Sequence, residues 1–374
     1  MRIRNRFRFL TLFAMVPAAL MSCSVKANKA DTDWWAVWND SWCDYERSYL
    51  AEIQSEPYYA GNKNGPVDPK AHRAAMQASR ALRDLLGRQM SVSRDIGRND
   101  SETAVCAIRE LHFWAQNDAL LGNNTMRGFY ERYWYSAGIG IAYAESRVLL
   151  AQAGQDVPDE IDRTIVNWLV DLGNSARRAM NNSPRDFDKR SETPSFRPSP
   201  HLAETNLGLW VGYYAIVAGS TANDLDLMRW GKGVQGAVLA KANGDGSLPM
   251  ELDRKQRALH YHYFALNPLV GGAILLDRAG IPFDRSERTA IDRLVDYTLA
   301  QTANPAGIRR AASTNRIEHP LRNGSWKSSF VGIALWCDYL ADDRSRCRSL
   351  PPRDELNFNY MGGSTEPWEV VGYR

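Results

Sequence analysis

Strand-like alternation of apolar and polar residues is essentially absent from this sequence of 374 residues, and so is a strong net charge. The first absence argues against a β-sheet protein. The formal net charge is +3. Residues 1–22 contribute +4 through four arginines, so the rest of the chain carries −1. A nearly neutral body has no overall field to hold nucleic acid, which excludes that class of partner. The chain is 44% hydrophobic and 24% charged, as expected of a folded protein with a large core.

Long hydrophobic runs are also missing, with one short exception. Residues 9–20 are apolar, follow a basic N-terminus, and are too short and too interrupted by proline to span a membrane. This pattern predicts an export signal over residues 1–22 of a bacterial protein. Residues 20–23 (LMSC) read as a lipobox, so we expect Cys23 to be lipidated in a periplasmic lipoprotein anchored in the outer membrane. Cleavage near Ala27 is the alternative, and it would give a soluble periplasmic or secreted protein.

Cysteine is scarce, and no Cys-x-x-Cys or Cys/His spacing suggests a zinc site. Once Cys23 is set aside, four cysteines remain, an even number that favours disulfides in an oxidising compartment. Four cysteines allow three pairings. Cys337 and Cys347 close a short loop at a helix end, which leaves Cys43 and Cys106 to join the N-terminal segment to a helix. We expect neither a metal nor a cofactor.

Helical periodicity is what the chain has in abundance, with mostly short connections that contain Gly, Asn or Pro. Two connections, residues 55–68 and 181–201, are long, and long loops inside a compact domain are more often functional than accidental. No repeat of about 34 or 40 residues is present, which argues against a helical repeat array. The pattern predicts an all-α protein, an incomplete (α/α) toroid around a groove, with the domain over 23–347 and a C-terminal tail over 348–374. The expected helices cover residues 69–90, 102–121, 133–152, 161–176, 202–219, 224–243, 255–280, 285–302 and 325–340.

Two neighbouring stretches, residues 246–252 (GSLPMEL) and 257–266 (RALHYHYFAL), are far more specific than this helical pattern. They resemble a segment of the periplasmic alginate lyases, which are poly-mannuronate lyases, that reads roughly G-F-L-P-x-E-L and then R-A-L-x-Y-H-x-Y-A-L. Residues 206–210 (NLGLW) resemble that family's N-N-H-x-Y-W, and Tyr59-Ala60-Gly61 stands at the place of its Y-E-G lid-loop motif. Residues 106–121 are similar to its E-C…W-A-x-D-x-A-L-L helix. The matches follow the family order over roughly residues 43–340, so the resemblance implies an (α/α) toroid and lyase chemistry.

A uronate lyase removes the proton α to a carboxylate and expels the 4-linked oxygen. It therefore needs cation or amide donors on the carboxylate, and a base and an acid on the reacting face. The resemblance assigns Asn206 and Arg257 to the substrate carboxylate and implies a catalytic His at position 207 and a catalytic Tyr at position 264. Those positions hold Leu207 and Phe264, and neither side chain can move a proton.

Proton transfer in such a lyase must then fall to other side chains. Arg257 lies one helical turn before the nearest tyrosine, where its charge could lower the pKa of the phenol. A structural role, as core residues with satisfied polar tips, is the alternative for the helical candidates. The predicted catalytic residues are Tyr261, His262, Tyr263 and Tyr59.

Two further residues are predicted to bind substrate. Trp210 could act as a sugar platform, and Arg254 belongs to a basic cluster that could line a groove for an acidic glycan. Their structural alternatives are helix packing for the tryptophan and a solvated face for the arginine, while Asn206 could be only a helix cap.

The leading interpretation is an exported, monomeric polysaccharide lyase-like protein that cleaves a uronic-acid-containing polysaccharide by β-elimination. Its partner would be an acidic polysaccharide, and it would meet a membrane only through the lipid anchor. The alternative is a catalytically degenerate glycan-binding or polymer-guiding protein on the lyase fold, which the loss of both proton-transfer positions favours. A third interpretation is a hydrolase with paired carboxylates, for which Glu251, Asp253 and Glu204 are the candidate acids.

Overall fold

The computed structural model describes residues 43, 48–61, 64–95, 101–181, 204–363 and 368. The chain divides into two units, Met1–Trp42 and Cys43–Arg374, and all described residues belong to the second. The predicted export signal and Cys23 lie outside the described residues, as does nearly all of the predicted loop over 181–201. Of the helices that are described, none combines the length and the apolar character needed to cross a membrane.

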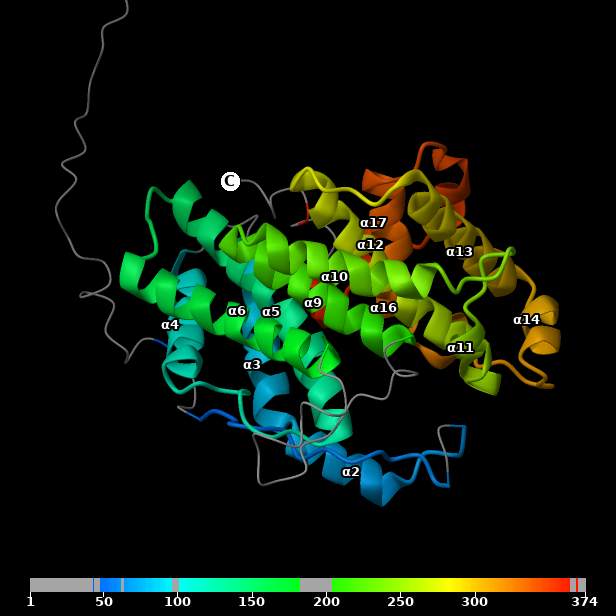
Figure 1. Cartoon of the computed structure of the whole chain (residues 1–374), viewed down its shortest axis with the longest axis horizontal. Helices are drawn as coiled ribbons and strands as arrows, with labels where there is room; N and C mark the ends of the chain where they lie inside the picture. The colour runs from blue at the N-terminus through cyan, green and yellow to red at the C-terminus, as the bar shows by residue number, and fades with distance from the viewer. Residues whose placement is uncertain are drawn as a thin grey trace, which may run out of the picture. The chain divides into compact units, whose positions relative to one another are not determined.

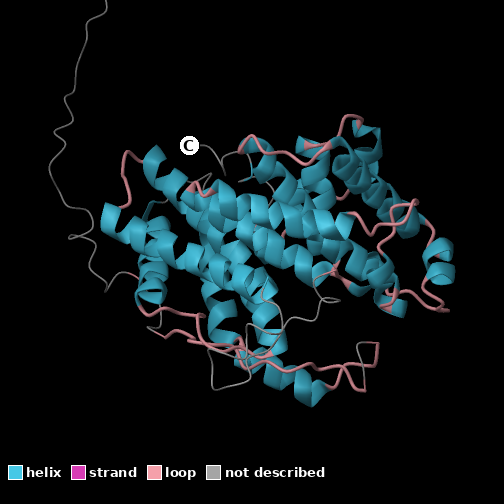
Figure 2. Cartoon of the chain, in the orientation of Figure 1, coloured by secondary structure: helices cyan, strands magenta, loops and turns pink. Residues whose placement is uncertain are grey.

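The described part of the second unit consists of helices and their connections, with two isolated β-bridges and no β-strand (Figure 2). The main helices are α2 (Pro69–Ala78), α3 (Arg80–Asp95), α4 (Ser101–Gln116), α5 (Met126–Gln152), α6 (Asp159–Asn181), α9 (Asn206–Ala222), α10 (Leu225–Leu239), α12 (Ala258–Arg278), α13 (Arg285–Ala303) and α17 (Val331–Tyr339). The short helices are α11 (Pro249–Leu252), η3 (Lys255–Arg257), α14 (Ala306–Ala311), α15 (Pro320–Asn323), α16 (Trp326–Ser329), η4 (Arg344–Ser349), η5 (Arg353–Glu355) and η6 (Asn359–Met361).

Consecutive long helices alternate between two layers (Figure 1). The inner helices α3, α5, α9, α12 and α17 pack against one another in chain order. Of the outer helices, α4 packs against α3 and α5, α6 against α9, α10 against α9 and α12, and α13 against α12. This alternation is the (α/α) toroid that the sequence predicted, and the fold prediction is confirmed.

Side-chain patterning explains which helices lie inside. Helices α5, α9 and α12 are buried on nearly every side, whereas α6 buries one stripe that includes Ile165, Trp168 and Leu172. Helices α9 and α10 approach closely because Gly212 and Gly231 face each other, and a Cβ atom on either would meet the carbonyl oxygen of the other.

Helix boundaries depart from the sequence prediction where the backbone turns. Ser79 separates α2 from α3 within the stretch predicted as a single helix. Helix α4 ends at Gln116 because Asp118 and Leu120 adopt left-handed φ angles of 49° and 65°. Lys255, with φ of 53°, likewise precedes α12 and cuts short the predicted 255–280 helix.

The predicted C-terminal tail packs into the helical unit. Leu356, Met361 and Trp368 are buried, and the Trp368 indole donates a hydrogen bond of 3.0 Å to the Met361 carbonyl. Arg278 of α12 donates to the Trp368 carbonyl. The unit therefore extends past the boundary predicted at residue 347, because large apolar side chains beyond it find cover against α5 and α12.

Both predicted disulfides are confirmed. Cys43 bonds to Cys106 on α4 with a Cα–Cα distance of 5.3 Å, and Cys337 bonds to Cys347 with a Cα–Cα distance of 6.0 Å. The first bridge fixes the start of the described chain to the outer layer.

Candidate active site

A cavity of about 790 Å³ opens where the N-terminal parts of α5, α9 and α12 meet. The loop over residues 57–61 lies along it and is bent back by an antiparallel bridge between Tyr59 and Val67. Backbone hydrogen bonds from Ala60 to Pro66 and from Asp68 to Tyr58 hold this loop. The predicted residues that line the cavity are Tyr59, Asn206, Arg254, Tyr261 and Tyr263.

Asn206 is held in place by Glu251, a buried carboxylate on α11. The Asn206 backbone N–H donates to Glu251 Oε1 at 2.7 Å, and its side-chain Nδ2 donates to Oε2 at 2.8 Å. Arg254 Nε lies 3.8 Å from the same Oε2. Glu251 is thus engaged by an amide and a cation, and it holds both of these groups at the cavity wall.

Two guanidinium groups and two phenols form a compact cluster. The Tyr59 and Tyr261 hydroxyls lie 3.4 Å apart. Arg257 stacks over the Tyr59 ring at 4.2 Å, and Arg254 stacks over the Tyr261 ring at 4.4 Å. The chain therefore brings Tyr59, on a loop, within reach of helix α12, as the sequence predicted.

The Arg257 guanidinium makes two polar contacts within the protein. Its Nη2 donates to the Gly65 carbonyl at 2.7 Å, and its Nε lies 3.6 Å from Glu318 Oε1. Arg257 is not among the residues that line the cavity, whereas Arg254 lines it together with Arg83 and Arg127.

The electrostatics favour a protonated Tyr59. Burial, and after it the neighbouring Tyr261, raises the pKa of Tyr59 to about 12, although Arg257 acts to lower it. At neutral pH this phenol carries its proton, so it suits the role of an acid that donates.

His260 also lines the cavity, and sequence reasoning did not select it. Its ring stacks on Phe264 at 6.4 Å, with an interplanar angle of 12°, and meets Tyr261 edge-on at 5.3 Å. Burial and the charge of Arg257 lower the pKa of His260, which keeps its imidazole neutral at neutral pH. The signal was present, because His260 precedes Phe264 by four residues and therefore shares its helix face.

Leu207 and Phe264 both line the cavity. These are the positions at which the resemblance implies a catalytic His and a catalytic Tyr. The cavity thus presents apolar side chains at both places. The side chains of Tyr59, His260 and Tyr261, which carry exchangeable protons, line the same cavity.

Three predicted site residues have their side chains buried and bonded or packed within the core. His262 is fully buried, accepts from the Leu248 N–H at 3.0 Å through Nε2, and meets the Ala258 carbonyl at 2.7 Å through Nδ1. Neither nitrogen is available to a substrate, so His262 is a structural residue. The Tyr263 hydroxyl bonds to Thr302 on α13 at 2.7 Å, and Trp210 is fully buried behind Phe264.

An aromatic wall from the C-terminal segment completes the cavity. Tyr360 stacks on Trp134 of α5 at 6.2 Å with an interplanar angle of 20°, and Phe358 packs on Tyr360 at 4.7 Å. Residues 358 and 360 lie in the segment predicted as a C-terminal tail, because nothing in the local pattern shows which helix they cover.

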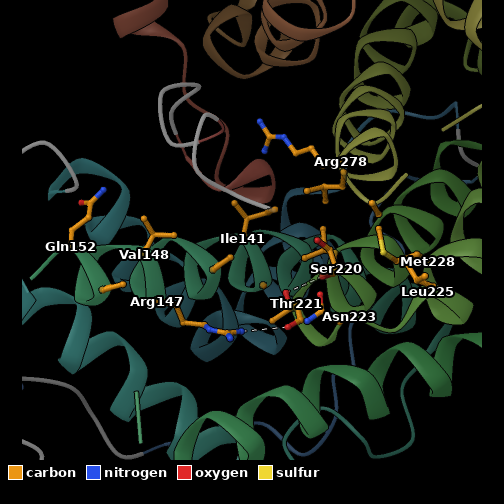
Figure 3. A pocket seen from close by; sticks show the side chains of 16 residues that line it. Ile141, Arg147, Val148, Gln152, Ser220, Thr221, Asn223, Leu225, Met228 and Arg278 are labelled. Carbon is orange, nitrogen blue, oxygen red and sulfur yellow. Dashed lines mark hydrogen bonds between the residues drawn. The ribbon is translucent and has the colours of Figure 1, made fainter. Parts of the chain in front are cut away.

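A second pocket, of about 700 Å³, lies at the opposite ends of α5, α9 and α12. None of the predicted site residues lines it. Figure 3 shows Arg147 directed toward Thr221, whose carbonyl it meets at 3.4 Å, and Asp162 lies 3.4 Å from the same guanidinium. Across the part of the chain that the structure describes, no three His, Cys, Asp or Glu side chains gather closely enough to hold a metal ion.

Comparisons with known proteins agree with this geometry. The sequence model of the alginate lyase family matches residues 28–308. A polysaccharide lyase of Stenotrophomonas maltophilia is 28% identical over 280 residues, 74% of this chain and 77% of that protein. An alginate lyase of Pseudomonas entomophila is 23% identical over 332 residues, 85% and 82% of the two chains.

Among solved structures, alginate lyase A1-III from Sphingomonas species A1 superposes with a TM-score of 0.63 at 21% identity, covering 87% of this chain and 84% of that one. A His-to-Ala variant of alginate lyase A1-III complexed with a tetrasaccharide superposes with a TM-score of 0.64 at 22% identity, covering 89% and 86%.

Proposed function

This chain belongs to the alginate lyase family and is a polysaccharide lyase, and we propose that it cleaves a uronic-acid-containing polysaccharide by β-elimination. The observation that carries the proposal is the cavity itself. Tyr59 reaches it from a loop, Arg254 from the residue before η3, and His260 and Tyr261 from the first turn of α12. These groups supply a cation for a carboxylate, a protonated phenol and a neutral imidazole.

The imidazole of His260 is the proposed base. It accepts the proton from the carbon α to the uronate carboxylate, and the C–H electrons form a double bond to the neighbouring carbon. The bond from that carbon to the linking oxygen then breaks, and the oxygen takes a proton from the Tyr59–Tyr261 pair. Solvent returns the proton from the imidazolium to the phenol, which completes the cycle.

The charge that develops on the carboxylate during proton removal needs donors already in place. Arg254 lines the cavity, and the second amide hydrogen of Asn206 is the other donor at this wall. Glu251 holds both groups at once, so their spacing is set before substrate binds. A fold neighbour complexed with a tetrasaccharide supports an oligosaccharide as the occupant of the cavity.

The proposed compartment is the periplasm, with the chain anchored through Cys23. Two disulfides support export, because such bonds form and persist in oxidising compartments.

The test is formation of the unsaturated uronate product, followed by its ultraviolet absorbance, on a panel of polyuronates. With the polymer that is cleaved, His260→Gln, Tyr59→Phe and Tyr261→Phe should each lower kcat by roughly 10²–10⁴-fold. Tyr49→Phe and His112→Gln are matched controls, because neither residue lines the cavity, and both should keep wild-type turnover. Near-normal turnover in all three cavity variants would contradict this mechanism.

A glycan-binding protein without catalysis is the second candidate, and the apolar Leu207 and Phe264 in the cavity wall favour it. Wild-type protein that binds polyuronates and forms no product from any of them would establish this alternative.

A further inference from the structure

A hollow of about 470 Å³ lies between the end of α13 and the segment that carries α14 and α15. Arg309, Arg316 and Arg322 line it, and no Asp or Glu does. His319 shapes its floor, since Nε2 meets the Thr302 carbonyl at 2.8 Å and Nδ1 accepts from the Leu321 N–H at 3.3 Å. We call this region the basic hollow.

The three guanidinium groups are exposed and form no ion pair in the part of the chain that the structure describes. Some exposed arginines elsewhere are paired, as Arg229 is with Asp226 at 2.9 Å, whereas these three share one concave surface. The only acid in residues 303–322 is Glu318, which faces Arg257 instead. Three like charges around one concave surface repel one another, and an anion within the hollow removes that repulsion.

The basic hollow adjoins the catalytic cavity. Tyr263 lines the cavity, Thr302 lines the hollow, and the hydrogen bond between their side chains, 2.7 Å long, forms the wall between the two. The loop at the edge of the hollow is also tied to the active site, because the Glu318 N–H donates to the Gln256 carbonyl at 2.7 Å.

We propose that the basic hollow is an accessory binding site for the carboxylates of the polyuronate that occupies the cavity, beyond the sugars being cleaved. The inference rests on the proposed function, since it takes the same polymer as its ligand. A polyuronate carries a carboxylate on each uronate, so a chain that leaves the cavity presents further anions to a neighbouring surface. Guanidinium forks match the geometry of carboxylates.

The test replaces Arg309, Arg316 and Arg322 together with alanine. The control replaces Arg163, Arg285 and Arg293, exposed arginines that line neither the hollow nor the cavity. Both are assayed on the longest polyuronate that is cleaved and on a tetrasaccharide of the same uronate. Three exposed charge pairs of ordinary strength correspond to about a tenfold change in affinity.

The hollow variant should raise KM about tenfold on the polymer, with kcat and the tetrasaccharide kinetics unchanged. The difference should vanish near 1 M salt, where the screening length falls to about 3 Å. An equal KM for the hollow and control variants, or a loss of turnover on the tetrasaccharide, would overturn the proposal.

Affinity electrophoresis in gels containing the polyuronate separates this inference from the proposed function. If wild-type protein cleaves nothing but is retarded by the polymer, and the hollow variant is retarded less than the control, the accessory site stands while the catalytic proposal fails. Absence of retardation in the wild-type protein, or equal competition by double-stranded DNA at the same charge concentration, would contradict the site.

Discussion

At the scale of single residues, two apolar side chains determine how this cavity can react. Leu207 and Phe264 line it from α9 and α12, and neither carries an exchangeable proton at its tip. Phe264 is packed between the rings of Trp210 and His260, at 5.1 Å and 6.4 Å. A tyrosine at that position keeps this packing and adds a hydroxyl.

Restoring the missing groups should therefore raise activity. Phe264→Tyr is expected to increase kcat on the cleaved polyuronate by about tenfold or more, and Leu207→His with Phe264→Tyr by more again, because proton transfer contributes roughly 10²–10⁴-fold. Phe264→Leu, which adds no proton-transfer group, is the matched control. Equal kcat for Phe264→Tyr and wild type would show that position 264 no longer meets the reacting bond.

Buried His262 makes folding sensitive to acid. Burial lowers the pKa of His262 to about 4, whereas the unfolded chain takes up the proton at its ordinary value of about 6.5. Stability from the neutral ring is complete above the unfolded pKa and is lost as the pH falls toward the folded pKa. Over roughly pH 7 to pH 4 the loss should approach about 3 kcal/mol.

Urea unfolding at both pH values measures this effect. His262→Gln, which does not titrate, should lack that part of the pH dependence while being less stable at neutral pH. The same pH dependence in variant and wild type would assign the acid sensitivity to other groups.

At the scale of helices, the spacing between layers depends on where side chains are missing. Helix α10 carries Gly231 at its contact with α9 and Gly233 on its exposed face, where a Cβ atom would meet nothing within 4 Å. The two glycines are two residues apart in the same helix, so intrinsic helix propensity affects them alike.

Alanine should have opposite effects at these two positions. Gly231→Ala is expected to destabilise the protein by about 1–3 kcal/mol, because the new methyl group collides with the Gly212 carbonyl. Gly233→Ala should stabilise it by about 0.5–1 kcal/mol. Chemical denaturation gives both values, and a stability loss at Gly233 equal to that at Gly231 would contradict the packing explanation.

At the scale of the whole molecule, two disulfides restrict the unfolded chain to different degrees. Cys43–Cys106 spans 63 residues and Cys337–Cys347 spans 10. The entropy of loop closure grows with the logarithm of that span, which gives about 4 kcal/mol for the first bridge and about 3 kcal/mol for the second.

Replacing each cysteine pair with serine should reproduce this order. Removal of Cys43–Cys106 should lower the free energy of unfolding more than removal of Cys337–Cys347, as measured by urea titration of the oxidised proteins. The reverse order would show that local packing at η4, rather than chain entropy, dominates.

The sequence by itself determined the helical class, the two disulfides and the region of the site. Helical period and turn residues mark where helices run, and the motifs around Asn206 and Arg257 mark two segments whose residues line one cavity. The sequence also showed the loss of proton-transfer groups at 207 and 264. Each of these properties depends on local sequence or on the number of cysteines, and folding changes neither.

Only the tertiary structure decided which neighbours each side chain meets. It directed His260 into the cavity and His262 into the core, and it left three arginines around one hollow. It also placed Tyr360 against α5 and Phe358 against α9 and α12. Helical periodicity says which face of a helix is apolar, but not which distant segment covers that face. Contacts between residues hundreds of positions apart, such as Tyr59 with Tyr261, depend on how the layers pack, and packing is a property of the whole chain.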